Sequence, residues 1–272
     1  MAFDVASVKL SKERADGYSM NFPLTLGPNM APVGNLMSVN VPLRVLIGFA
    51  YKITVGQTHF LMPGLPDWVD AEWFDVEARA ADNPTKDQFR LMVQSLLADR
   101  FKLTTHRETR QVPILAMVLS EPGKTGPQLT PHTDDAMCVD GQPDALRTPN
   151  PGLPPFACGS ILFPGLRPSV PGRIKGGGRK LNLDYIAAFL TGFQGLDLDR
   201  PVVNRTGLTG SYDFWMELVP QSSAYLPFDT QPDPTGPTVL EALNEQLGLK
   251  LERTTGPVDV LVVDHIEQPS PN

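Results

Sequence analysis

An internal repeat is the feature that most constrains how this chain can fold. Residues 96–118, LLADRFKLTTHRETRQVPILAMV, align without a gap with residues 242–264, ALNEQLGLKLERTTGPVDVLVVD. The shift of 146 positions places Leu97 on Leu243, Arg107 on Arg253 and Val112 on Val258. Self-similarity at a fixed shift indicates that a structural unit occurs twice. Each copy predicts the end of a helix followed by a two-stranded hairpin.

A second pair of segments extends the repeat. Residues 43–51 and 183–191 both carry apolar residues at positions i, i+3, i+4 and i+7, the spacing of an amphipathic helix. A later helix is predicted from about 86 to 100, with Asp82 or Asn83 as its N-cap. Its counterpart is predicted over 239–247 and ends at Gly248, which favours the left-handed C-cap conformation.

The element order predicts the fold class α+β. Each half is expected to run strand, helix, strand, strand, helix, strand, strand. We therefore predict two homologous small modules, residues 1–120 and 179–272, packed together. Residues 121–178, rich in Pro and Gly, are predicted to be a connecting insert.

Composition narrows the possible partners. The net charge of −7 argues against nucleic acid or an anionic membrane as the main partner, because both require a basic face. No apolar run reaches the 18 or so residues that a membrane-spanning helix needs. The start, MAFDVASVKL, has no signal-peptide pattern and enters a strand directly. It is the start expected of a mature exported chain that follows an initiator.

Two cysteines flank part of the Pro-rich segment. A disulfide between Cys138 and Cys158 would close this loop and stabilise it by roughly 3 kcal/mol in the chain-entropy model. The alternative is two unpaired thiols. If the disulfide forms, the compartment is oxidising, periplasmic or extracellular.

Several motifs resemble a known family. They are FDVASVK at the start, FDVEA at 74–78, LLADRFKL at 96–103, TGLTG with YDF at 206–214, and EQLGLKLE with VLVVDHIE towards the end. The chain is similar over nearly its whole length to an uncharacterised family of exported proteins, expanded in soil bacteria and sometimes fused to BlaR-type membrane metallopeptidases. The repeated unit also resembles, more weakly, the short N-terminal domain of secretins and TonB-dependent receptors. This resemblance implies an extracytoplasmic location and no particular chemistry.

No catalytic signature is present. The four histidines, His59, His106, His132 and His265, have no metal-binding spacing, so no metal site and no cofactor are predicted. A GxSxG nucleophile motif is absent. The glycines of GGG at 176–178 and TGLTG at 206–210 lack the strand-to-helix context of a phosphate loop, which favours a structural role. Asp264 and His265 are neighbours on a predicted strand and would point to opposite faces.

Two clusters are candidate ligand-binding sites. Asp67, Trp68 and Trp73 lie in a loop with further acids, as in sugar or peptide sites, although such tryptophans also anchor loops over a core. His106, Arg107 and Arg110 could bind an anion, or could protect an exposed strand edge. The repeat of Arg107 as Arg253 favours a role in the fold.

The sequence predicts an extracytoplasmic binding or interaction module, a sensor or scaffold at the cell envelope. Its partner is an unidentified small molecule, peptide, glycan or envelope protein. The alternative is a hydrolase acting on an ester, peptide or glycan in a cleft between the modules. A structural envelope protein is the third possibility.

Overall fold

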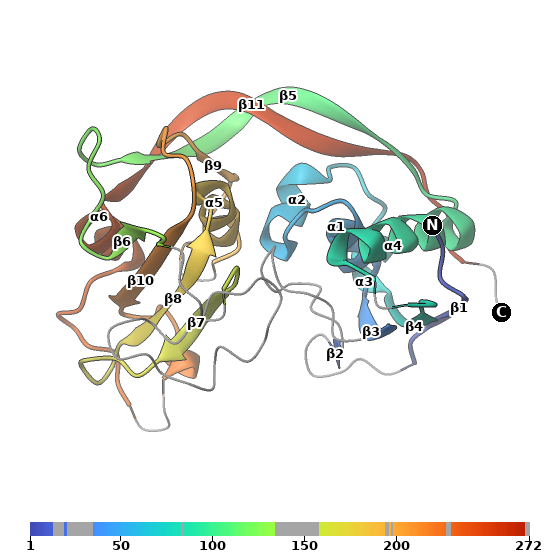
Figure 1. The fold of residues 1–272 in the computed structure, drawn as a ribbon, viewed down its shortest axis with the longest axis horizontal. Helices are drawn as coiled ribbons and strands as arrows, with labels where there is room; N and C mark the ends of the chain where they lie inside the picture. The colour runs from blue at the N-terminus through green and yellow to red at the C-terminus, as the bar shows by residue number, and fades with distance from the viewer. Residues whose placement is uncertain are drawn as a thin grey trace. The chain divides into compact units, whose positions relative to one another are not determined.

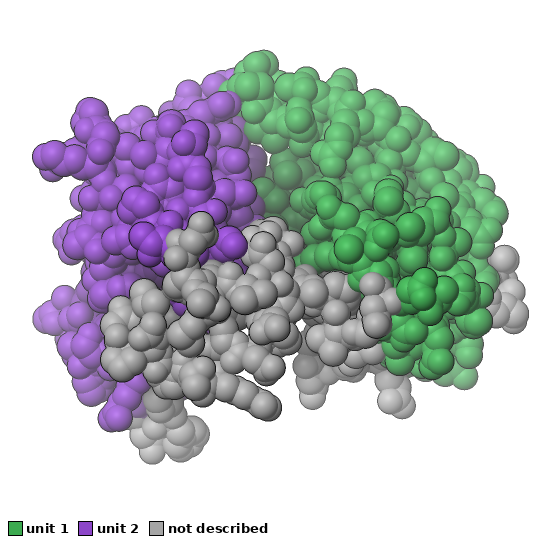
Figure 2. All heavy atoms as spheres, in the orientation of Figure 1, with its two compact units in different colours: residues 1–25, 31–112, 256–272 green, residues 26–30, 113–255 purple. Residues whose placement is uncertain are grey.

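The computed structural model describes residues 1–12, 19–20, 35–82, 84–133, 158–193, 196, 198–226 and 230–269. These residues form helices and sheets, which confirms the α+β class (Figure 1). The chain divides into two compact units (Figure 2). The described part of unit 1 falls within 1–112 and 256–272, and that of unit 2 within 113–255.

Unit 1 contains a four-stranded sheet with strand order β1-β4-β3-β2. Its pairings β1–β4, β3–β4 and β2–β3 are all antiparallel. The chain order of its elements is β1 (Val5–Leu10), β2 (Ser19–Met20), β3 (Leu36–Pro42), α1 (Leu43–Ala50), η1 (Val55–Gln57), α2 (Thr58–Leu61), α3 (Trp68–Ala71), β4 (Trp73–Arg79) and α4 (Lys86–Phe101).

Unit 2 contains a sheet of the same form, with strand order β6-β10-β8-β7. All three of its pairings are antiparallel. Its elements in chain order are β6 (Leu129–Pro131), β7 (Ile161–Leu166), β8 (Ile174–Leu181), α5 (Leu183–Thr191), β9 (Val202–Asn204), β10 (Tyr212–Leu218), η3 (Ser223–Tyr225) and α6 (Val239–Leu247). Strands β6 and β7 and most of β8 therefore lie within 121–178, the range for which a connecting insert was expected.

Two long strands pass from one unit to the other. β5 (Thr104–Leu119) leaves unit 1 after Val112, and β11 (Leu249–His265) leaves unit 2 after Thr255. They pair with each other, and β5 also pairs in parallel with β9. The predicted hairpin is therefore wrong, because 104–119 forms one continuous strand. Its partners are distant strands rather than its own second half.

The core of each unit contains residues from the last part of a strand that begins in the other unit. Leu103, next to the start of β5, and Leu261, near the end of β11, belong to the core of unit 1. Leu115, near the end of β5, and Leu249, at the start of β11, belong to the core of unit 2. These residues are the aligned pairs of the sequence repeat, so the repeated strands exchange their ends between the cores.

The helix ends follow from local chemistry. Thr85 and Thr238 begin α4 and α6, and each forms a capping box with the residue three positions later. The N-cap of α4 is therefore Thr85, and the prediction of Asp82 or Asn83 for this position is wrong. The C-caps Lys102 and Gly248 are aligned in the repeat, and both adopt left-handed backbone, with φ of 51° and 66°. The C-cap expected at Gly248 is confirmed.

Candidate functional site

A pocket of about 760 Å³ lies in unit 2, and it is the candidate ligand site. Its volume falls within the roughly 300–1,000 Å³ typical of small-molecule sites. The lining residues come from β7, β8, α5, β10 and the segments that follow α5 and β10. They are Phe163, Ile174, Phe189, Gly192, Phe193, Leu218, Pro220, Gln221, Ser222, Ala224 and Tyr225.

One side of the pocket is a cluster of three phenylalanine rings. The ring of Phe193 meets the ring of Phe163 edge to face, with centroids 5.1 Å apart and an interplanar angle of 88°. The ring of Phe189 lies 5.3 Å from that of Phe193. The edge-to-face arrangement of Phe163 and Phe193 is favourable because the positive edge of one ring meets the negative face of the other. The cluster therefore presents aromatic edges and faces to the cavity.

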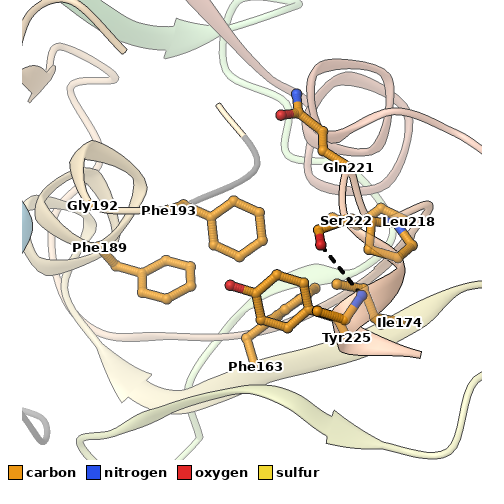
Figure 3. Close-up of a pocket in the computed structure, with 11 residues that line it drawn as sticks. Phe163, Ile174, Phe189, Gly192, Phe193, Leu218, Gln221, Ser222 and Tyr225 are labelled. Atoms are coloured by element: carbon orange, nitrogen blue, oxygen red, sulfur yellow. Dashed lines mark hydrogen bonds between the residues drawn. The ribbon is translucent and has the colours of Figure 1, made fainter. Parts of the chain in front are cut away.

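The polar side of the pocket is the turn after β10. Ser222 caps the short helix η3, and its Oγ accepts a hydrogen bond from the backbone N–H of Ala224. The backbone N–H of Tyr225 donates to the carbonyl of Ser222, which fixes the start of the tyrosine side chain. Figure 3 shows the Tyr225 hydroxyl directed towards the side of the pocket where Phe189 and Phe193 lie.

Strands β8 and β10, which border the pocket, and the residues next to them carry charged side chains that pair with one another. Glu217 is buried, and its carboxylate accepts hydrogen bonds from the amide and the hydroxyl of Ser169. Burial raises its pKa, but the Ser169 hydrogen bonds and the nearby Lys175 charge outweigh that effect, so the pKa is lowered. Arg173 bonds Asp233 at 2.7 Å, and Lys175 lies 4.2 Å from the centre of the Trp215 ring.

A buried histidine–aspartate hydrogen bond at the other end of this sheet is the second candidate. His132 Nδ1 lies 2.8 Å from Asp213 Oδ1, and their side chains are 3% and 13% exposed. The same oxygen accepts from the backbone N–H of Lys180 at 2.9 Å, and Arg179 Nε lies 3.8 Å from Oδ2. The register of β8 against β10 shifts here, and Lys180 has a φ of 53°. Asp213 thus holds a β-bulge together, a feature often found near functional sites.

The aspartate–histidine pair is enclosed. His132 Nε2 is buried with no hydrogen-bond partner. Because Nδ1 faces a carboxylate, Nδ1 carries the proton in the neutral ring and Nε2 is an acceptor. This is the protonation pattern of a general base, but the low exposure keeps a substrate away from it.

The tryptophan loop predicted from the sequence lies in unit 1 and anchors the chain. Trp68 packs against the core of unit 1, with its ring 6.4 Å from that of Phe74 at an angle of 73°. Asp67 is exposed and precedes the short helix α3, where its carbonyl accepts from Asp70 and Ala71. Trp73 begins β4, where its carbonyl accepts from Ser11. These contacts are compatible with anchoring, and ligand binding by the loop stays a prediction.

The basic cluster on β5 is also placed in unit 1, and its members contact different groups. His106 Nδ1 lies 2.9 Å from the Asp264 carboxylate. Arg107 donates to the carbonyl of Tyr51, the C-cap of α1. Arg110 donates to Glu108 through both Nε and Nη2. The three side chains therefore have separate partners, and a shared anion-binding role for them stays a prediction.

Other predicted features have the following places. His59 is exposed, and His265 pairs with Glu267 at 2.7 Å. Within the described residues no group of three or more potential metal ligands occurs, and no helix is long and apolar enough to cross a membrane. Cys158 is buried, but Cys138 lies outside the described residues, so their disulfide stays a prediction.

Few sequence features predicted either candidate site in unit 2. The pocket aromatics come from segments between residues 163 and 225 and form no motif. His132 and Asp213 are 81 positions apart. The only signal for Asp213 was its place in the YDF motif, which recurs in the first half as FDV.

The fold and the pocket define an α+β protein with a site of small-molecule size. The chain belongs to the family described as Protein of unknown function (DUF3738), whose model matches residues 44–266. No curated protein and no solved structure gives a significant match to the chain.

Proposed function

We propose that this chain is an extracytoplasmic binding protein and that the pocket in unit 2 holds a small molecule. The observation that carries the proposal is the pocket itself. It is lined mainly by apolar and aromatic side chains and carries a few polar groups on one side, which is the usual composition of a ligand site. In this role the chain would act as a sensor or carrier at the cell envelope.

A hydrolase is the second candidate, favoured only by the Asp213–His132 pair. The buried Ser160 precedes β7, and His132 follows β6, so the two lie at opposite edges of the sheet. Three strand spacings separate these edges, about 14 Å at roughly 4.8 Å each. A serine nucleophile must lie within hydrogen-bond distance of its base. The strand order therefore does not favour Ser160 and His132 as such a pair.

Ligand binding can be tested with a thermal-shift screen of the whole chain against cell-wall sugars, short peptides, apolar metabolites and generic esters. Binding at the pocket is expected to raise the melting temperature with one class of compound. Ala224→Phe should abolish that shift, because position 224 lines the pocket. Ser223→Phe is the matched control, since Ser223 is exposed on the same turn and does not line the pocket.

The same screen separates the two candidates. Ester turnover that persists in Ala224→Phe and disappears in His132→Ala would favour the hydrolase. A shift that both turn variants retain would place the ligand elsewhere and contradict the pocket proposal.

Export is supported by the family resemblance and by the paired positions of the two cysteines. The test is alkylation of the folded protein, purified from an oxidising compartment, followed by mass measurement. With a Cys138–Cys158 disulfide, neither cysteine is alkylated before reduction and both are alkylated after it. Two alkylated cysteines before reduction would contradict the pairing.

A further inference from the structure

We infer that the ligand of this pocket is an uncharged molecule with a flat aromatic group, an inference that rests on the proposed function. The first ground is charge. None of the described residues that line the pocket carries a formal charge. A charged ligand would lose its hydration on entry and find no opposite charge, which is costly in an apolar site.

The nearby charges do not supply a counterion. Ile174 and Leu218 line the pocket, whereas Lys175 and Glu217 follow and precede them on β8 and β10. Successive side chains of a strand point to opposite faces, so these two charges lie on the other face of the sheet. They also have partners, since Lys175 lies 3.7 Å from Glu217 and over the Trp215 ring.

The second ground is the geometry of the rings. Phe163 and Phe189 both contact Phe193, at ring distances of 5.1 Å and 5.3 Å, so the wall combines ring edges and faces. Such a wall favours another aromatic ring over a saturated group of equal size, because edge-to-face contacts add to simple burial. Gly176 helps to set this wall. A Cβ at that position would lie 2.5 Å from the Phe163 ring.

The third ground is the polar side. Tyr225 is 39% exposed, and its hydroxyl points across the pocket in Figure 3. Gln221 adds an amide that can both donate and accept. These neutral groups suit a carbonyl, amide or hydroxyl on the ligand. The pocket thus matches an aromatic ring that carries one neutral polar substituent.

Four probes of similar size test this inference by calorimetric titration of the whole chain. They are 2-naphthamide, 2-naphthoate, 2-naphthylmethylammonium and decahydronaphthalene-2-carboxamide. We expect 2-naphthamide to bind about tenfold more tightly than each of the others. Tyr225→Phe should weaken 2-naphthamide by about threefold to tenfold through loss of one hydrogen bond.

Gln221→Lys places a charge at an exposed position of the lining and should narrow the gap between 2-naphthoate and 2-naphthamide. Equal or tighter binding of either charged probe to the unaltered chain would overturn the claim of neutrality. Equal binding of the saturated amide would overturn the claim of aromaticity. If none of the four binds, the inference on ligand class fails. The proposed function then stands or falls separately on the broader screen and on Ala224→Phe.

Discussion

At the scale of single residues, we expect Asp213 to contribute more to the stability of unit 2 than an exposed ion pair contributes. It accepts from His132 and from the Lys180 backbone, and its second oxygen lies 3.8 Å from Nε of the buried Arg179. We expect Asp213→Ala to lower the free energy of unfolding by about 2–4 kcal/mol, because His132 and the Lys180 amide both lose the oxygen that accepts their hydrogen bonds. Urea unfolding measures this loss.

The matched control is Asp264→Ala. The Asp264–His106 pair is about half exposed, at 47% and 53%, and water screens its charges. Its removal should cost at most about 1 kcal/mol. Losses of similar size in the two variants would show that Asp213 does not hold the bulge.

The two aligned C-caps give a second residue-scale prediction. Lys102 adopts left-handed backbone at a cost of about 1–2 kcal/mol that glycine avoids. Lys102→Gly should therefore be neutral or stabilising by up to about 1 kcal/mol, once the greater chain entropy of glycine is counted. The side-chain bond of Lys102 to the carbonyl of Asp99 is exposed and adds little.

The reverse exchange should destabilise. At Gly248 a Cβ would lie 2.5 Å from the backbone nitrogen of Gly126, so Gly248→Lys meets a steric clash as well as backbone strain. We expect a loss of about 2 kcal/mol or more in thermal or urea unfolding. A loss of stability of similar size in Lys102→Gly would contradict the strain assigned to the left-handed backbone of Lys102.

At the scale of elements, helix α4 begins with a buried lysine, Lys86, whose positive charge is unfavourable at a helix N-terminus. Lys86 is the first residue of the helix, where the N-terminal dipole repels positive charge. Burial, with a further contribution from Arg90, lowers its pKa from 10.5 to about 8. Between these values the unfolded chain keeps the proton and the folded chain has lost it, so stability rises with pH.

The expected rise is about 2 kcal/mol between pH 7.5 and 9.5. Lys86→Met should abolish this rise and should be more stable than the unaltered chain at pH 7.5. Chemical unfolding of both proteins across this range is the measurement. Parallel pH profiles would contradict the role of Lys86. Tyr185, whose pKa is raised to about 12 by burial, titrates mainly above this range and is common to both.

Local patterns in the sequence predicted the helices and the class of fold. The spacing of apolar residues predicted α5 with the bounds that it has, and the repeat together with Gly248 predicted those of α6. The long course of β5 was not predictable in this way. The alternation of apolar and polar residues indicates a strand but does not identify the strands that pair with it. The pairing of Leu115 with Val202 joins segments far apart in the chain.

The candidate site could not be predicted for the same reason. Each pocket phenylalanine is explained equally well as a core residue of its own strand or helix. Only the pairing of β7 with β8 and the turn after β10 bring Phe163, Phe193 and Tyr225 together. The tryptophan loop and the basic cluster lie in unit 1, where Trp68 packs against the core and Arg107 bonds the end of α1, and their ligand-binding role stays a prediction.

At the scale of the whole molecule, the exchange of strand ends makes each core depend on both halves of the sequence. Leu261 lies in the second copy of the repeat but is buried in the core of unit 1, at 1% exposure. Leu249 begins the same strand and is buried in the core of unit 2, at 0%. Equal substitutions in one strand should therefore weaken different units.

We expect Leu261→Ala and Leu249→Ala each to cost about 2–5 kcal/mol, because both leave a cavity in a packed core. Hydrogen exchange followed by mass spectrometry locates the damage, since local opening reports on the weakened unit. Leu261→Ala should speed exchange in α1 and α4, and Leu249→Ala in α5 and α6. If both variants instead speed exchange in α5 and α6, the second half of the sequence would have a core of its own, and the two cores would not share their strands.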